Sequence, residues 1–253
     1  MRSVTNTANW LLLVFGAAAA VISQSVRPIT WRRTVRAEFW RYMDMVCVGN
    51  LPSMLIAAVL VGLTLVSQAL FWVDQFGQSD TIGEVILFIV VRELGPLIVG
   101  LLTLGSGGIV LLGELSAMRA SGELDALDRQ GIDPFLLLVV PRVAALVVAV
   151  FVHTLVFIVV AFTAGYTLAQ AAGASVEAPA QFVINIMTGI GTTGYLVLPI
   201  KALAIGLTIG VVCSLTAMDR DMASLSRERL TAKGFIRAIS GILLVSALLS
   251  AAI

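Results

Sequence analysis

A series of uninterrupted apolar segments constrains this chain more than any other feature of its sequence. Several of these segments reach the ~20 residues that an α-helix needs to cross a lipid bilayer. Hydrophobic residues make up 59% of the chain and charged residues only 12%, whereas a soluble domain has about 45–50% and about 25%. The segments do not alternate as the ~10-residue strands of a membrane β-barrel do. We therefore predict an all-α integral membrane protein.

Five apolar segments are long enough to span a membrane, and together they predict one membrane domain over residues 1–253. Their ranges are 51–72, 85–112, 143–168, 199–218 and 235–253. A shorter apolar segment, Trp10–Ile22, has about a dozen residues, which is too few to span. Only Arg2 precedes it and five arginines follow it, a charge order that favours a helix in the membrane interface over a signal peptide. We expect residues 5–41 to combine this interfacial helix with a basic segment.

The basic residues are distributed unevenly between the two sides of the predicted membrane. Lys and Arg are concentrated before the first span, between the second and third, and between the fourth and fifth, whereas the other two loops have none. The positive-inside rule then places the N-terminus in the cytoplasm and the C-terminus on the periplasmic side. In the first basic segment, Arg27–Arg41, aromatic residues are interleaved with arginines. Directly before a span, this pattern favours contact with anionic headgroups over nucleic acid.

The second predicted span contains ionisable and helix-perturbing residues, namely Arg92, Glu93, Gly95 and Pro96. A charge inside a span costs about 2.5–3.5 kcal/mol on insertion scales, so such residues commonly have a function. We therefore predict that these four residues belong to a substrate pathway. The alternative is that Arg92 and Glu93 lie near the outer interface, where long side chains reach the headgroups.

The longest polar interruption, Glu114–Arg142, separates the second and third spans. Some of its apolar residues recur at the i, i+3, i+7, i+10 spacing of one helical face, namely Ala117, Ala120, Leu124 and Leu127. We predict a short amphipathic helix over residues 114–131 at the cytoplasmic surface. Gly131 suits its C-terminal stop, and Asp133-Pro134 suits the N-cap and first position of the next helix. A rigid helix with defined ends suits contact with a cytoplasmic partner.

Three sequence blocks carry the recognisable motifs of the chain: VGNLPSMLIAAVLVGLTL, VRELGPLIVGLL and ELSAMRASGELDALDRQGIDPFLLLVVPR. Together they resemble the MlaE/YrbE family of ABC-transporter permeases, which work in phospholipid transport with MCE-domain proteins. The resemblance implies a homodimeric permease of the bacterial inner membrane, with an N-terminal interfacial helix, five spans and a cytoplasmic coupling helix between the second and third. It also implies a cytoplasmic ABC ATPase docked on this helix, a periplasmic MCE-domain protein, and a lipid substrate that enters a cavity at the dimer interface.

The resemblance also assigns roles to individual residues. Those that match the family's motif in the second span are Arg92, Glu93, Gly95 and Pro96. Those expected to couple to the ATPase are Glu114, Met118, Glu123, Asp125, Leu127, Gly131, Asp133, Pro134 and Arg142. The chain departs from the family pattern in three places: Gly122 stands where an acid is usual, Gly105–Ile109 lacks an arginine, and SLSRERLTAKGF replaces a glycine-rich stretch. We expect the ATPase contact and the substrate preference to differ accordingly.

No G-x-x-x-x-G-K-[ST] phosphate loop occurs in the chain, so we expect the partner ATPase to use ATP and Mg²⁺ and this chain to bind no cofactor. Its single histidine and two cysteines show no metal-ligand spacing. An ion-coupled secondary transporter or channel using Arg92, Glu93 and Lys201 is the alternative, although no inverted repeat is visible. An intramembrane enzyme with Ser106 and His153 is a further alternative, but the residues around Ser106 do not match a Gly-x-Ser-Gly motif.

Overall fold

The computed structural model describes residues 2–76, 93–173, 178–219 and 226–251, and within these ranges the chain is helical without strands. Five helical segments are long and apolar enough to cross a membrane. They are Arg33–Gln68, Gly95–Ala120, Phe135–Ala171, Tyr195–Met218 and Glu228–Ala251. A shorter apolar helix, Trp10–Val26, precedes them. The predicted fold class, an all-α membrane protein with five spans and an N-terminal helix, is confirmed.

The elements follow one another in a simple order along the chain. Before the first gap they are α1 (Arg2–Val26), the 3₁₀ turn η1 (Pro28–Thr30), α2 (Arg33–Met43), the π-helical η2 (Asp44–Val48) and α3 (Leu51–Phe76). Next come α5 (Gly95–Thr103), the π-helical η4 (Leu104–Gly108), α6 (Ile109–Ala120), α7 (Glu123–Arg129), the π-helical η5 (Phe135–Val139) and α8 (Val140–Ala171). The last two helices are α9 (Pro179–Met218) and α10 (Arg227–Ala251).

Three of the predicted spans, 51–72, 143–168 and 199–218, lie inside longer helices. The segment 51–72 is part of α3, and the segment 199–218 is the second half of α9, which begins at Pro179. Pro199 therefore lies within a helix rather than at its start, a position that membrane helices tolerate because neighbouring groups can satisfy the freed carbonyl. The first part of the predicted span 85–112 lies outside the described residues.

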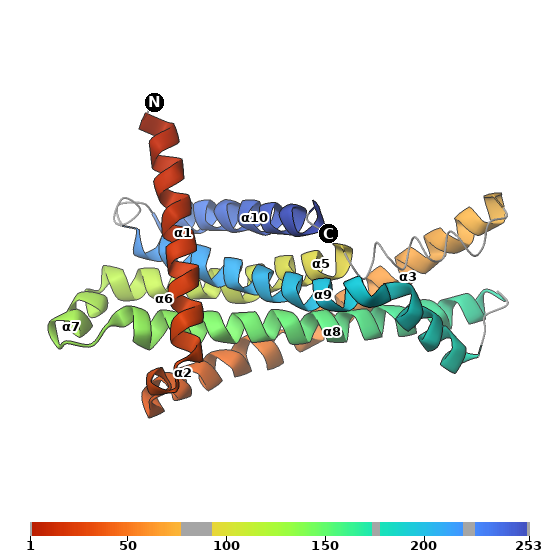
Figure 1. Cartoon of the computed structure of the whole chain (residues 1–253), viewed down its shortest axis with the longest axis horizontal. Helices are drawn as coiled ribbons and strands as arrows, with labels where there is room; N and C mark the ends of the chain where they lie inside the picture. Colours follow the sequence, from red (N-terminus) through yellow and green to blue (C-terminus); the bar gives the residue numbers. More distant parts are fainter. Residues whose placement is uncertain (1, 77–92, 174–177, 220–225, 252–253) are drawn as a thin grey trace.

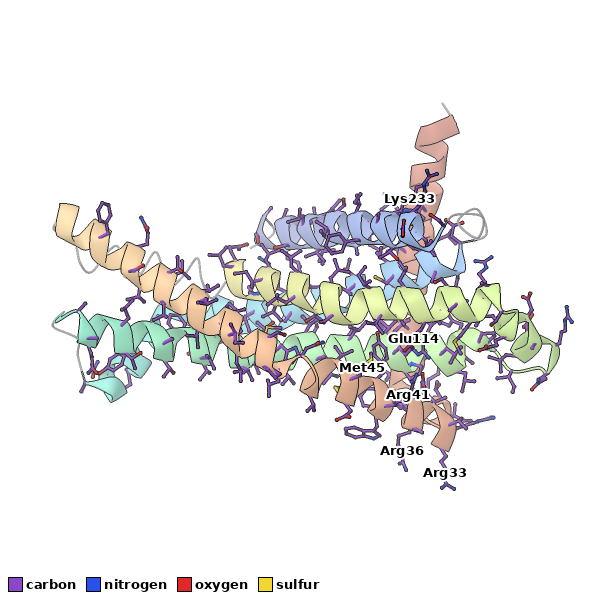
Figure 2. The ribbon with its side chains drawn as sticks, turned by 180° about the vertical axis from the view of Figure 1, so that it is seen from behind. Arg33, Arg36, Arg41, Met45, Glu114 and Lys233 are labelled. Atoms are coloured by element: carbon purple, nitrogen blue, oxygen red, sulfur yellow. The ribbon has the colours of Figure 1, made fainter. Side chains whose placement is uncertain are left out.

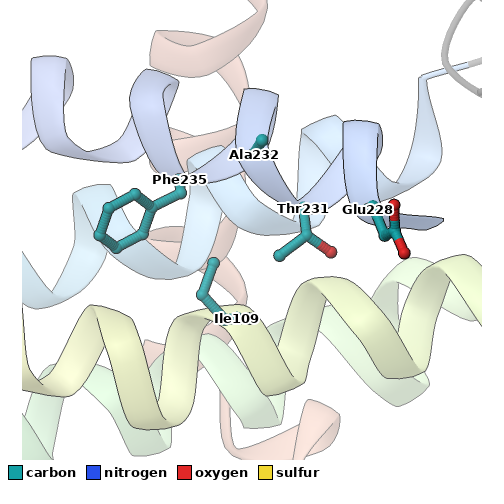
Figure 3. A pocket seen from close by; sticks show the side chains of 5 residues that line it. All are labelled: Ile109, Glu228, Thr231, Ala232 and Phe235. Carbon is teal, nitrogen blue, oxygen red and sulfur yellow. The ribbon is translucent and has the colours of Figure 1, made fainter. Parts of the chain in front are cut away.

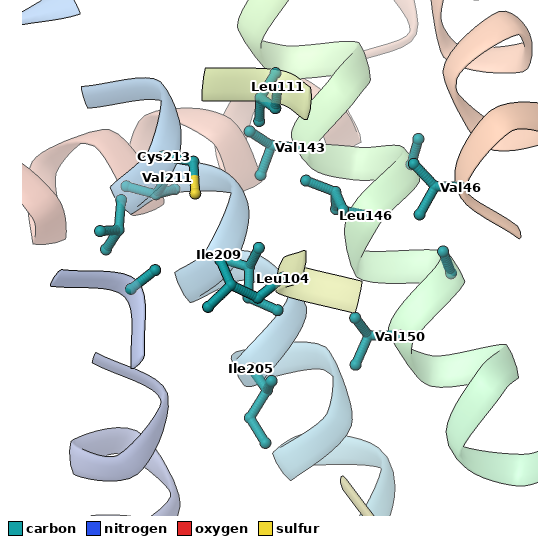
Figure 4. Packing of buried hydrophobic residues seen from close by; sticks show 14 of the residues in the cluster. Val46, Leu104, Leu111, Val143, Leu146, Val150, Ile205, Ile209, Val211 and Cys213 are labelled. Atoms are coloured by element: carbon teal, nitrogen blue, oxygen red, sulfur yellow. The ribbon is translucent and has the colours of Figure 1, made fainter. Parts of the chain in front are cut away.

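Helix α8 lies at the centre of the bundle and packs against α2, α3, α5 and α9. Membrane helices approach closely where their contact residues are small. Two glycines allow such close approach to α8. A Cβ on Gly62 of α3 would overlap the backbone of Ala161 on α8, and a Cβ on Gly206 of α9 would lie 2.7 Å from the Cα of Val147. Fully buried branched side chains fill the space between the helices (Figure 4).

Two of the π-helical segments are held by polar side chains. A π-helical turn shifts the helical hydrogen-bond register, and such turns are frequent at functional sites. The carbonyl of Cys47 in η2 lies 2.9 Å from Nε2 of His153, which is fully buried. The hydroxyl of Tyr42 donates a 2.7 Å hydrogen bond to the carbonyl of Gly107 in η4. The first contact joins the first span to α8, and the second joins the first span to the second span.

The basic segments gather at one end of the bundle. Helix α2, helix α7 and the start of α10 lie at the same end, while α1 runs across the other helices near it (Figure 1). The end of α3, the end of α8 and the start of α9 lie at the opposite end (Figure 1). This clustering is what the positive-inside rule requires of a cytoplasmic side, although the interfacial position of α1 stays a prediction.

Candidate functional site

The predicted single helix over residues 114–131 is in fact two helices. Helix α6 continues from the second span to Ala120, and α7 begins at Glu123. Gly122 between them has φ 80°, in the left-handed region, which costs a side chain with a Cβ about 1–2 kcal/mol. Its N–H donates to the carbonyl of Arg119 at 3.1 Å. The chain therefore turns at Gly122, which explains why glycine suits this position.

The end of α7 and the start of the next helix are confirmed as predicted. Gly131 has φ 74°, its N–H donates to the Asp128 carbonyl at 2.9 Å, and the N–H of Ile132 donates to the Leu127 carbonyl at 3.0 Å. This pair of bonds is a Schellman motif. Asp133 then accepts a 2.8 Å hydrogen bond from the N–H of Phe135 through Oδ1, as an N-cap residue does. The return into the membrane is therefore rigid.

Helix α7 forms the tip of the basic end of the molecule (Figure 1). Leu124 is buried, and Met118 and Leu127 pack against the core. The exposed residues of this tip include Glu123, Asp125, Asp128, Arg129, Gly131 and Asp133. Of the residues predicted to couple to an ATPase, the acidic ones on and beside α7 are thus available to a partner, whereas the apolar ones hold α7 on the bundle.

Glu114 and Arg142 have a different environment from the rest of the predicted coupling residues. Nε of Arg142 donates to Oε1 of Glu38 at 2.7 Å, its Nη2 lies 2.6 Å from the same oxygen, and its Nη1 lies 3.0 Å from Oε2 of Glu114. Arg41 completes the group, with Nη2 2.8 Å from Oε1 of Glu38 and 3.7 Å from Oε2 of Glu114. We call these four side chains the brace.

The brace joins three elements at the base of the tip, because its members come from α2, α6 and α8; Figure 2 labels Arg41 and Glu114. Its two acids and two arginines balance, which is what permits the Arg142 side chain to be only 2% exposed. The Tyr42 ring adds a cation–π contact, with its centroid 5.8 Å from Cζ of Arg142. Being buried, Arg142 can act on a docked partner only through the position of these helices.

A second ionic cluster lies at the far end of the spans. Nζ of Lys201 on α9 donates to Oε2 of Glu93 at 2.6 Å and to Oγ of Ser250 on α10 at 2.9 Å. The Ser250 hydroxyl lies 2.8 Å from Oε1 of Glu93. Lys201 is fully buried, whereas the Glu93 side chain is 31% exposed. Three spans therefore meet at one polar point.

The predicted substrate-pathway residues are distributed around this cluster. Glu93 is part of it, and Gly95 and Pro96 are buried in the first turn of α5 directly after it. Arg92 lies outside the described residues. Lys201 was predicted only for an alternative function, and Ser250 was not predicted, because nothing in the local sequence marks a serine near the end of an apolar helix.

A groove of about 580 Å³ opens between α6 and α10 (Figure 3). It is lined by Ile109, Glu228, Thr231, Ala232 and Phe235. Most of its lining is apolar, and Glu228 lies at the end of the groove that is nearer the basic end of the molecule. Four of the five lining residues belong to SLSRERLTAKGF, the segment that replaces the family's glycine-rich stretch. None of the five was a predicted site residue.

Ser106 and His153 do not form a catalytic pair. Oγ of Ser106 donates a 2.9 Å hydrogen bond to the carbonyl of Leu102 within its own helix, and His153 contacts Cys47 instead. Within the described ranges, no group of three or more His, Cys, Asp or Glu residues could hold a metal ion.

The fold and these clusters define a multi-pass helical membrane protein with ion pairs near both ends of its spans. The sequence profile of the family described as Permease MlaE matches residues 39–252, and the chain belongs to this family. The resemblance found in the sequence is therefore confirmed.

Individual relatives match about half of the chain. The intermembrane phospholipid transport system permease protein MlaE of Haemophilus influenzae is 27% identical over 125 residues, which cover 49% of this chain and 48% of that protein. A probable ABC transporter permease protein of Synechocystis sp. is 33% identical over 129 residues, or 51% and 49% of the two chains. The chloroplastic protein TRIGALACTOSYLDIACYLGLYCEROL 1 of Arabidopsis thaliana is 28% identical over 143 residues, or 56% and 39%. The chain thus spans about half the length, or less, of these curated relatives.

Proposed function

We propose that this chain is the permease subunit of an ABC transporter that moves phospholipid or a similar lipid. A separate cytoplasmic ATPase would bind ATP and Mg²⁺ and drive the movement. A periplasmic MCE-domain protein would exchange the lipid with the inner membrane. The observation that carries this proposal is the family match over residues 39–252, which includes the polar cluster at Glu93 and the exposed tip at α7.

The tip is suited to receive force from an ATPase. Helix α7 has a glycine turn at one end and a Schellman motif at the other, and Leu124 fixes it to the bundle. Its exposed face carries Glu123 and Asp125. A push on this face reaches α2 and α8 through the brace, because Glu114 and Arg142 are 3.0 Å apart. Such rigid-body displacement of helices is a common switching movement.

The cluster of Glu93, Lys201 and Ser250 is suited to a lipid headgroup. A phosphate could replace the Glu93 carboxylate beside the ammonium group of Lys201, since both are anionic oxygen acceptors. The partial exposure of Glu93 leaves a route of approach. Arg92, adjacent in sequence, is a second predicted phosphate ligand.

The proposed assembly is a homodimer in the bacterial inner membrane, with the lipid cavity between two copies. Basic residues at the end that carries α2 and α7 support a cytoplasmic position for that end and for the N-terminus. The C-terminus would then be periplasmic. Exposed apolar side chains on α10, such as Leu243 and Leu248, support its contact with lipid or with the second copy.

A charge reversal on the tip tests the ATPase contact. We expect Asp125→Lys to reduce co-purification of the native ATPase at least about tenfold, because like charges placed across an interface cost several kcal/mol. The matched control is Glu228→Lys, which reverses an exposed acid on α10 rather than on the tip. Equal loss with both variants, or loss with neither, would contradict docking on α7.

A second measurement separates lipid transport from ion-coupled transport. The chain and its ATPase are reconstituted in proteoliposomes, and ATP-dependent phospholipid transfer is recorded together with ion flux. We expect Lys201→Met to lower phospholipid transfer while ATPase docking persists, because the cluster is remote from α7. Ion flux that depends on Lys201, without ATP-dependent lipid transfer, would favour the ion-coupled alternative instead.

A further inference from the structure

Four arginines in and before α2 have no role in either cluster. Arg27, Arg32, Arg33 and Arg36 are all exposed, and none of them forms an ion pair within the ranges that the structure describes. The nearest acid on the same helix, Glu38, is already held by the brace. We call these four residues the basic face. It is a concentration of positive charge without compensation from the described part of its own chain.

Exposed apolar side chains accompany this charge. Val26 is 78% exposed, Ile29 77% and Trp40 62%. Trp31, Phe39 and Trp40 form two edge-to-face contacts, with ring centroids 5.2 Å and 5.4 Å apart. Exposed aliphatic residues beside arginines suit the boundary between headgroups and acyl chains, where Trp is also enriched. A purely polar polyanion would leave the aliphatic residues in water.

The orientation of α2 presents the basic face outward. Val35 and Tyr42 are 6% and 1% exposed, and with Glu38 they follow the spacing of one helical face. Arg33 and Arg36 lie on the other side, and Figure 2 shows both pointing away from the bundle. Because α3 begins its apolar span shortly after α2, this outward face lies where the membrane surface begins.

We propose that the basic face binds the headgroups of anionic phospholipids as a fixed lipid site. This site is separate from the cluster at Glu93. The brace residue Glu114 follows Glu93 by 21 positions along α5 and α6, roughly 30 Å at the rise of a helix. A lipid held at α2 is therefore not a lipid bound at the polar cluster. The inference stands whether or not the chain transports lipid.

The test uses the full chain in a non-ionic detergent, titrated with short-chain phosphatidylglycerol. The variant Arg33→Gln/Arg36→Gln is compared with Arg229→Gln/Lys233→Gln, which also removes two exposed positive charges, but on α10. We expect the first variant to bind about tenfold more weakly, since each basic residue near an anionic surface contributes substantially. The control should bind within about twofold of the parent chain. Arg33→Lys/Arg36→Lys should retain most of the affinity and shows that loss comes from charge rather than misfolding.

Three further titrations decide what occupies the site. Phosphatidylcholine should bind more weakly than phosphatidylglycerol, and equal binding would overturn a requirement for anionic headgroups. Glycerol 3-phosphate should fail to displace phosphatidylglycerol at equal concentration; equal displacement would mean a site for free anions. A single-stranded oligonucleotide that binds more tightly than the lipid, per phosphate, would identify a nucleic-acid surface instead.

Equal weakening of phosphatidylglycerol binding in Arg33→Gln/Arg36→Gln and Arg229→Gln/Lys233→Gln would also reject the site at α2.

Discussion

Replacing Arg142 with Met would test whether the brace stabilises this end of the bundle. Arg142→Met keeps an unbranched side chain that covers the inner part of the arginine stem, but it removes the guanidinium group and its charge. It removes the contacts of 2.6 Å and 2.7 Å to Glu38 and the 3.0 Å contact to Glu114. Arg41→Met is the matched control, because Arg41 contacts the same two acids but its side chain is 59% exposed.

The difference in burial sets the expected magnitudes. Removing one partner of a buried ion pair costs about 3–5 kcal/mol when the other charge is left uncompensated. Here Arg41 still neutralises Glu38, so we expect Arg142→Met to lower the free energy of unfolding by about 2–3 kcal/mol. Arg41→Met should cost less than about 1 kcal/mol, as exposed pairs do.

Both variants are unfolded by SDS in mixed micelles, with Glu38→Gln added to each to complete a double-mutant cycle. The coupling energy of Glu38 should exceed about 1 kcal/mol with Arg142 and stay below about 0.5 kcal/mol with Arg41. If the two arginine variants lose the same stability, burial does not determine the strength of the brace. If Arg142→Met loses none, the brace has no stabilising role.

Two glycine substitutions test the backbone geometry by the same unfolding measurement. Gly122→Ala should destabilise by about 1–2 kcal/mol because φ is 80°, although the added Cβ meets nothing within 4 Å. Gly105→Ala is the control, because Gly105 also has open space but no positive φ. It should not destabilise, since alanine favours a helix more than glycine does. Gly62→Ala should destabilise by about 3 kcal/mol or more, because its Cβ would overlap the Ala161 backbone and force α3 away from α8. A neutral Gly62→Ala would mean that these helices are not held at the distance the structure shows.

The parts that the sequence predicted correctly depend on local chemistry. Apolar length defined the five spans, since a helix must bury all its backbone groups to cross a membrane. The stop at Gly131 and the cap at Asp133 follow from the conformations and hydrogen bonds available to those residue types. Gly122 was noted only as a departure from the family pattern, although its positive φ explains the break between α6 and α7.

The ion pairs of the two clusters could not be predicted from the sequence, because they join distant positions of the chain. Glu38 and Arg142 are 104 residues apart, and Lys201 and Glu93 are 108 apart. A single sequence shows that each charge needs compensation, but not which of several opposite charges supplies it. For the same reason, the sequence did not predict that Glu38 and Glu114 balance the charge of Arg142.

Helix α2 brings the two proposals together, because its opposite faces have different partners. Its inner face carries Glu38 into the brace, which meets the tip through Glu114. Its outer face carries Arg33 and Arg36. A rigid helix cannot move one face without the other, so an ATPase docked on α7 and a lipid bound to the basic face would bias the same element. Coupling between two binding events is reciprocal. Whatever docking does to the affinity for anionic lipid, anionic lipid must therefore do to docking, by the same factor.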